Sequence, residues 1–172
     1  EPGSTFKLFS IVAALDDGVI DLEDKVAIGK IKYHDREMKD SHIKGYGPET
    51  IRQAFEESSN VGISQAIYNA YKHNPQKFTD KLYSMRVNKS IGIDIAGEQE
   101  PIVKNPKMKS WSKVTLPWMS IGYEVALTPI QILTFYNAIA NNGKMMKPQF
   151  VKEVKRLGKT ENVFQPSVLQ DS

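Results

Sequence analysis

Ser4 and Lys7 place a hydroxyl and an amine three residues apart near the start of the chain. On a helix, residues at this spacing share one face, so the two side chains can meet. In a first helical turn, the positive end of the dipole favours the anion that forms when a serine attacks a carbonyl. Burial against Phe6 and Leu8 would lower the pKa of the Lys7 amine toward its neutral, basic form. The pair therefore predicts a serine activated by lysine, although a capping serine followed by a surface lysine would have the same spacing.

Ser58 and Asn60 form a second polar pair, between two predicted helices. In that position they would present a hydroxyl and an amide to a cleft at the helix ends. Taken alone, the two residues are typical of a helix boundary, where side chains of both types cap the backbone.

Composition narrows the classes of function. The chain of 172 residues carries a net charge of +3 with no long run of one sign, so we expect no nucleic-acid partner. There is no cysteine, and His34, His42 and His73 show no ligand spacing, so neither a metal nor a cofactor is predicted. The lysines between 104 and 113 read as a solvated loop, and no apolar run reaches the ~20 residues that span a bilayer.

Helical periodicity and capping residues predict a helix-rich chain with little sheet. We expect the first and last helices to be buried on nearly all sides, because apolar residues occupy almost every position. The stretch 19–46 lacks a clean period and predicts irregular segments with short strands, and 90–98 reads as turn-rich. A hairpin is predicted from 150–154 and 163–164, with its turn at Gly158. The predicted helices cover 4–16, 48–55, 61–71, 75–85 and 128–141.

The residues around both polar pairs resemble the motifs of a known family. Glu1–Lys7 reads EPGSTFK and resembles the first motif of class B penicillin-binding proteins, the monofunctional transpeptidases of peptidoglycan synthesis. Ser58–Gly62 reads SSNVG and looks like their second motif, S-x-N. Gly92–Glu98 and Ser120–Gln131 also resemble family segments in the expected order, the latter slightly closer to the division-specific branch. The resemblance spans essentially the whole chain.

The resemblance implies a role for each residue of the two pairs. Ser4 would attack the penultimate D-alanine of a stem peptide ending in D-Ala-D-Ala, and Lys7 would take its proton. Ser58 would relay a proton to the leaving amine, and the amide of Asn60 would bind the substrate backbone and help to hold Lys7. The acyl-enzyme would pass to a second chain's amine, which forms the crosslink.

One departure concerns the family's third motif, K-T-G on a sheet strand. The nearest string, Gly158–Glu161, reads GKTE in a polar turn, so Lys159 and Thr160 are interpreted as hairpin residues. We expect the strand to follow Ser172, which makes 1–172 a partial transpeptidase domain that starts just before the catalytic serine. The expected fold class is mostly α: the α-rich part of an α/β penicillin-binding and β-lactamase-like domain, with most of its sheet missing. Such a fragment would be inactive alone.

The resemblance also implies partners and a location. β-Lactams would be covalent inhibitors, and cell-wall synthesis or division proteins would be partners. The site would lie on the extracytoplasmic, periplasmic face of the membrane, anchored by an upstream segment. Without the sheet, Phe6, Phe9 and Ile11 would be exposed, so self-association of the fragment is a further expectation.

Two alternatives remain at this stage. A class D β-lactamase or related β-lactam sensor also has an S-T-F-K motif, but it carries an apolar residue where Asn60 stands and hydrolyses its acyl-enzyme. A non-catalytic helical module that docks other cell-wall proteins is supported by the missing third motif alone.

Overall fold

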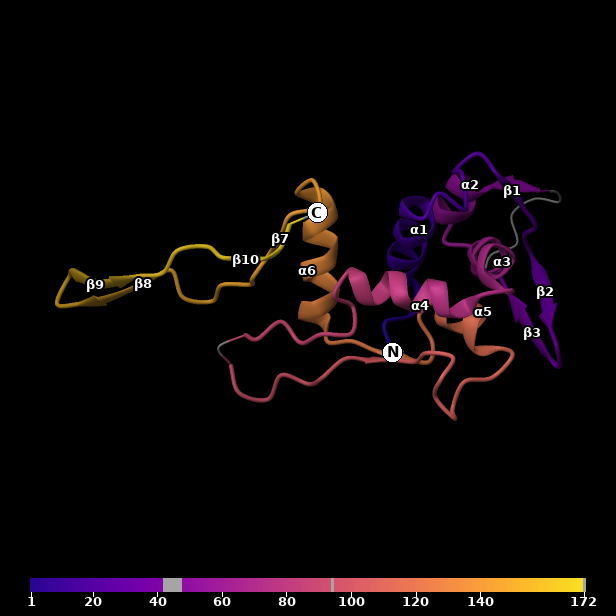
Figure 1. Ribbon diagram of the computed structural model, residues 1–172. Helices are drawn as coiled ribbons and strands as arrows, with labels where there is room; N and C mark the ends of the chain where they lie inside the picture. The colour runs from indigo at the N-terminus through magenta and orange to yellow at the C-terminus, as the bar shows by residue number, and fades with distance from the viewer. Residues whose placement is uncertain (42–47, 94, 172) are drawn as a thin grey trace. The chain divides into compact units, whose positions relative to one another are not determined.

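The computed structural model describes residues 1–41, 48–93 and 95–171 (Figure 1). The expectations for His42, for the end of the 19–46 stretch and for Asp94 fall outside the described residues. The chain forms two compact units. The first combines Glu1–Lys89 with Pro101–Leu127, and the second combines Ser90–Glu100 with Thr128–Ser172.

The described residues of the first unit form helices and three small antiparallel strand pairs. The pairs are β1 with β4, β2 with β3, and β5 with β6. Its helical elements are the 3-10 turn η1 (Gly3–Phe6), α1 (Lys7–Asp16), α2 (Ile51–Glu56), α3 (Asn60–Tyr71), α4 (Pro75–Ser84) and α5 (Thr115–Met119). Its strands are β1 (Lys25–Val26), β2 (Lys30–Tyr33), β3 (Arg36–Lys39), β4 (Glu49–Thr50), β5 (Ile102–Val103) and β6 (Val125–Ala126).

The predicted helices of this unit are confirmed, with small shifts at their ends. The one expected over 48–55 begins later, at Ile51, because Thr50 caps it: its side chain accepts from the N–H of Gln53, whose own side chain bonds back to Thr50. The α1 helix is not buried on every side, since Leu15 is exposed.

The expectation that Phe6, Phe9 and Ile11 would be exposed is wrong. All three side chains are buried, and the rings of Phe6 and Phe9 stack with centroids 4.9 Å apart. The chain's own helices therefore cover these residues without any further sheet. The expectation of self-association loses the support it drew from them.

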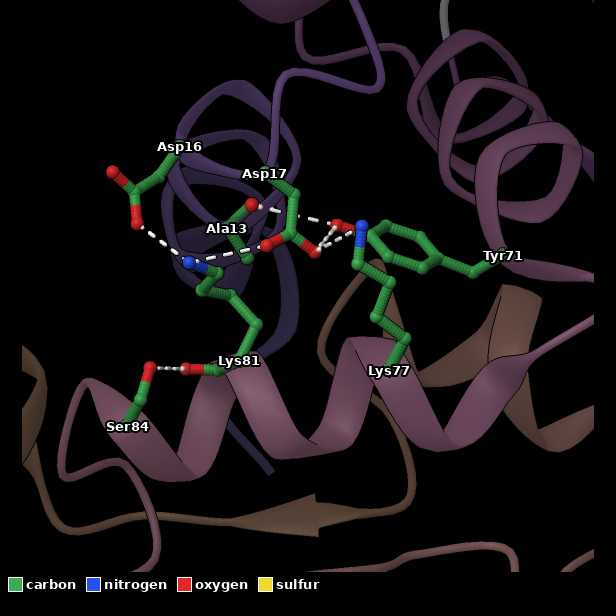
Figure 2. Close-up of polar contacts among 7 residues, drawn as sticks. All are labelled: Ala13, Asp16, Asp17, Tyr71, Lys77, Lys81 and Ser84. Carbon is green, nitrogen blue, oxygen red and sulfur yellow. Dashed lines mark hydrogen bonds and ion pairs between the residues drawn. The ribbon is translucent and has the colours of Figure 1, made fainter.

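A polar network joins the end of α1 to α3 and α4 (Figure 2). The hydroxyl of Tyr71 on α3 donates to Asp17 Oδ2 over 2.9 Å. Lys81 on α4 lies 3.1 Å from Asp17 Oδ1, and Lys77 lies 3.5 Å from Oδ2. Because the Asp17 side chain is nearly buried, these partners stabilise a carboxylate that would otherwise be costly to desolvate.

In the part of the second unit that the structure describes, there are one long helix and two strand pairs. The β8–β9 hairpin extends away from α6 (Figure 1), and all of its residues are exposed. Lys159 and Thr160 lie on its second strand, so the interpretation of these two as hairpin residues is confirmed. The elements are α6 (Pro129–Ala140), β7 (Met145–Met146) paired with β10 (Val168–Gln170), and β8 (Glu153–Arg156) paired with β9 (Lys159–Val163).

The α6 helix forms where predicted but is not buried on all sides. Thr128 caps it and pairs with Gln131 in a capping box, as the sequence favours. Leu133 is 62% exposed, and Tyr136 and Ile139 on the same face are also exposed. The apolar pattern and the cap therefore predicted the helix correctly. They did not predict which of its side chains would be buried.

Taken together, the described elements form a helix-rich structure with small sheets. None of the described helices is both long enough and apolar enough to cross a bilayer.

Candidate active site

Lys7 begins α1 and is almost fully enclosed, with 1% of its surface exposed. Its amine reaches across to the turn before α3, where Nζ donates to Ser58 Oγ over 3.0 Å and to the Ser58 carbonyl over 2.6 Å. The two residues are separated by 51 positions in the sequence. The structure thus brings the first predicted pair into contact with the second.

Burial lowers the pKa of Lys7 from 10.5 to about 8, and the negative charge of Asp40 acts in the opposite direction. The direction agrees with the expectation from burial. An amine with a pKa near 8 is neutral in an appreciable fraction of molecules at physiological pH, which suits a general base.

Ser4 lies in the 3-10 turn η1, one turn ahead of α1, and its side chain is exposed. The expected helical start is therefore corrected: the α-helix itself begins at Lys7, whose N–H donates to the Ser4 carbonyl. Within the described residues the Ser4 hydroxyl makes no hydrogen bond, so the predicted bond to the Lys7 amine is not formed. The amine contacts Ser58 instead.

The turn that carries Ser4 is docked on a later segment of the same unit. The Gly3 N–H donates to the Gly122 carbonyl over 3.1 Å, and the Glu124 N–H donates to the Glu1 side chain over 3.1 Å. A β-carbon on Gly122 would lie 2.0 Å from the Gly3 carbonyl oxygen. Only glycine permits this approach, which holds Gly3, the residue before Ser4, against a fixed surface.

Ser58 and Asn60 lie on either side of the N-cap of α3. Ser58 has a left-handed backbone, with φ at 55°, and Ser59 caps the helix by accepting from the Gly62 N–H over 2.8 Å. The Asn60 amide donates to the Lys39 carbonyl over 3.4 Å, a long and weak bond. Both residues therefore sit at a helix boundary, and of the two, Ser58 is the one that contacts Lys7.

Sequence reasoning missed Asp40, which follows β3 and contacts the same turn. Its carboxylate accepts from the Ser59 hydroxyl and from the Val61 N–H, each over 3.0 Å. No motif or spacing marks it, because it lies about twenty positions ahead of the residues that it contacts. An acidic residue within a stretch predicted to be irregular with short strands was the sole signal.

Across the described stretches, no cluster of three histidine, cysteine or acidic side chains could hold a metal ion.

Comparison with known proteins adds a family to this geometry. Residues 1–171 match the profile described as the penicillin binding protein transpeptidase domain. Penicillin-binding protein PbpB of Mycobacterium tuberculosis is 28% identical over 156 residues, which cover 88% of this chain and 22% of that protein. Peptidoglycan D,D-transpeptidase FtsI of Escherichia coli is 27% identical over 172 residues, covering 99% of this chain and 28% of that protein.

Solved structures agree with these relatives. The crystal structure of penicillin-binding protein 3 from M. tuberculosis superposes with a TM-score of 0.78 at 27% identity, over 98% of this chain and 37% of that one. The penicillin G acyl-enzyme complex of penicillin-binding protein A from the same organism gives 0.74 at 23% identity, over 98% and 39%. The chain spans about a quarter of the length of the curated relatives that it matches.

Proposed function

The chain belongs to the penicillin-binding protein transpeptidase family, and we propose that it supplies the nucleophile and base of a D,D-transpeptidase that crosslinks peptidoglycan. The contact between Lys7 and Ser58 is the observation that carries this proposal. Lys7 and Ser58 are far apart in sequence, and the buried amine of Lys7, whose pKa is about 8, contacts the Ser58 hydroxyl. This contact can carry a proton between the two residues.

In the proposed reaction, Ser4 Oγ attacks the carbonyl carbon of the penultimate D-alanine, and Lys7 Nζ accepts the hydroxyl proton. The carbon–nitrogen bond then breaks, and the terminal D-alanine leaves with a proton delivered through Ser58 Oγ. The ester on Ser4 is next attacked by an amine of a second stem peptide, which restores the free serine. The delivery of a proton to the leaving amine uses the contact between Lys7 Nζ and Ser58 Oγ, which are already 3.0 Å apart.

Asn60 has a different proposed role, as a donor to the backbone of the bound peptide. The bond from Asn60 to the Lys39 carbonyl is long and therefore weak. A substrate carbonyl could take the place of the Lys39 carbonyl with little loss of free energy. This exchange would place the peptide along the turn before α3.

The finer assignments are part of the same proposal. We place the described helices in the helical portion of an α/β transpeptidase fold, with the site on the extracytoplasmic face of the membrane. β-Lactams would acylate Ser4, since the neighbouring penicillin-binding protein A forms a penicillin G acyl-enzyme. Stem peptides are the proposed substrates, in line with the name of the relative peptidoglycan D,D-transpeptidase FtsI. Division or wall-synthesis proteins are the proposed partners.

Fluorescent-penicillin labelling of the full-length protein tests this function. We expect one labelled peptide containing Ser4, loss of labelling in Ser4→Ala, and normal labelling in Ser110→Ala, a control at an exposed serine. A label on any other residue would overturn the assignment of the nucleophile. Rapid hydrolysis of the adduct would instead indicate a β-lactamase.

A further inference from the structure

We propose that Asp40 is a positioning residue of this site: its carboxylate fixes the turn that presents Ser58, and its negative charge acts on the Lys7 amine. The inference rests on the proposed function, because it concerns how the same site is assembled and tuned.

The carboxylate of Asp40 gathers donors from two separate segments. From the start of α3 it accepts the Ser59 hydroxyl, 3.0 Å from each oxygen, and the Val61 N–H over 3.0 Å. From the start of the β2–β3 hairpin it accepts the Gly29 N–H over 2.7 Å, while its own N–H donates to the Gly29 carbonyl. One side chain thus ties the hairpin to the N-terminus of α3.

These contacts require a carboxylate rather than an amide. Every partner is a donor, and they approach both oxygens of Asp40. Asparagine would turn an NH₂ group toward at least one of these donors and lose that bond. The negative charge is also favoured at this point, because it lies at the positive end of the twelve-residue helix α3.

The turn held by Asp40 is the one that Lys7 contacts. Ser58 directly precedes Ser59, and its left-handed backbone aims both its carbonyl and its hydroxyl at the Lys7 amine. Left-handed geometry is unfavourable for serine, so it persists because neighbouring bonds hold it. Releasing Ser59 from Asp40 would let the turn relax and would lengthen the contact between Ser58 and Lys7.

Asp40 also acts on Lys7 through its charge. Ser58, whose hydroxyl and carbonyl contact the Lys7 amine, is uncharged at neutral pH. Among the described titratable groups, Asp40 is the one whose charge raises the pKa of the amine, against the effect of burial. Asp40 therefore helps to set the pH above which Lys7 is neutral.

The test measures the acylation rate constant of the full-length protein with fluorescent penicillin between pH 6 and 10. Asp40→Asn should lower the plateau rate by about 10- to 100-fold, because the turn is misplaced. It should also shift the rising limb to lower pH by up to about one unit, because an attractive charge is gone. Ser59→Ala should lower the plateau of the acylation rate and leave the pH at which the rate rises unchanged. Asp35→Asn, which removes a charge at the exposed hairpin tip, should change neither.

Each outcome decides a different point. An Asp40→Asn profile that coincides with the wild-type profile overturns the inference, while a wild-type protein that is not labelled at Ser4 overturns the proposed function instead. If circular dichroism shows that Asp40→Asn is unfolded, Asp40→Glu decides: it keeps the charge but displaces the oxygens, so the inference requires a lowered plateau on an unmoved limb. A wild-type plateau in that variant rules out the positioning role.

Discussion

At the scale of a single residue, the burial of Lys7 has opposite effects on stability and on reactivity. A buried amine is costly to charge, and burial lowers the pKa of Lys7 to about 8 although Asp40 opposes that change. The same desolvation that weakens the fold at neutral pH makes the amine available as a base. The proposed chemistry therefore depends on a local cost in stability.

The first prediction concerns the pH dependence of acylation. Because the neutral amine is the reactive form, the rate of penicillin acylation should rise with pH through about 8 and should be about tenfold below its plateau at pH 7. Lys7→Arg should show no acylation at any pH, since a guanidinium does not deprotonate in this range. Stopped-flow labelling between pH 6 and 10 checks both, and a flat profile would exclude Lys7 as the base.

The second prediction concerns stability. Lys7→Met should raise the free energy of unfolding at pH 6 by up to about 3 kcal/mol, because a buried charge is replaced by an apolar chain. The folded pKa lies below the ordinary value, so the wild-type protein binds fewer protons when folded and gains stability as pH rises above about 8. The difference between the two proteins should therefore shrink above that pH. Urea unfolding at pH 6 and pH 9.5 measures it, and an equal difference at both would contradict the assignment.

At the scale of elements, the site is a set of short segments pressed together. The η1 turn rests on the segment around Gly122, and the start of α3 is held by the residue after β3. Neither contact is local in sequence, so each helix could form normally while the site remained unassembled.

The third prediction tests the first of these contacts. Gly122→Ala should destabilise the protein by about 3 kcal/mol or more and abolish acylation, because its β-carbon would overlap the Gly3 backbone. Gly97→Ala is a matched control, with a similar positive φ and no atom within 4 Å of the added carbon, and should cost only about 1–2 kcal/mol. Thermal unfolding and penicillin labelling report the two effects, and equal losses in both variants would argue against the close approach.

The fourth prediction concerns the network at the end of α1 (Figure 2). Burial acts to raise the pKa of Asp17, but its bonds to Lys81 and Tyr71 outweigh burial and the pKa is lowered overall. Asp17→Asn should cost about 1–3 kcal/mol at pH 7, whereas Lys77→Met, at a more exposed and longer contact, should cost less than about 1 kcal/mol.

The pH dependence of the Asp17 variant has a defined sign. A lowered carboxyl pKa contributes stability above the unfolded value, and that contribution is lost as pH falls through the folded pKa. The gap between wild type and Asp17→Asn should therefore narrow below about pH 4. Unfolding curves at pH 7 and pH 3 compare the two, and a gap that widens in acid would exclude this account.

The sequence allowed the helices to be predicted well, because their caps and periodicity are local signals. Thr128, a good N-cap residue, followed by Pro129 in the first turn marked the start of α6. Burial was predicted poorly, in both directions: Phe6 is enclosed and Leu133 is not. Burial depends on which segments pack together, and a single sequence does not state that.

The site shows the same division. The Ser4 and Ser58 motifs could be recognised, because the chemistry restricts residue types at short spacing. Asp40 could not, because its partners Ser59 and Val61 are reached only after the chain has folded back. The 3-10 geometry at Ser4 was also missed, and the contact of the neighbouring Gly3 with Gly122 joins segments far apart in sequence.

At the scale of the whole molecule, the chain divides into two units of different character. The first buries the large apolar residues of η1 and α1, while the second leaves an apolar stripe on α6 exposed: Leu133, Tyr136 and Ile139. Exposed stripes of this kind favour association between molecules.

The fifth prediction follows from that stripe. The 172-residue chain should self-associate as its concentration rises, and Leu133→Ser should weaken the association. Leu157→Ser is the control, because this leucine is 97% exposed at an isolated hairpin tip and should have no effect. Sedimentation velocity measures both, and an unaffected Leu133→Ser variant would mean that association uses another surface.

The contact between Glu1 and Glu124 joins residues 123 positions apart. This separation affects when the contact forms during folding. Closing so long a loop is a slow, entropically costly event, and such contacts form late when helices nucleate first. The serine's turn would then be the last part of its unit to acquire its geometry, both during synthesis and on refolding. A covalent label on that serine would report completed folding rather than the earlier appearance of helix.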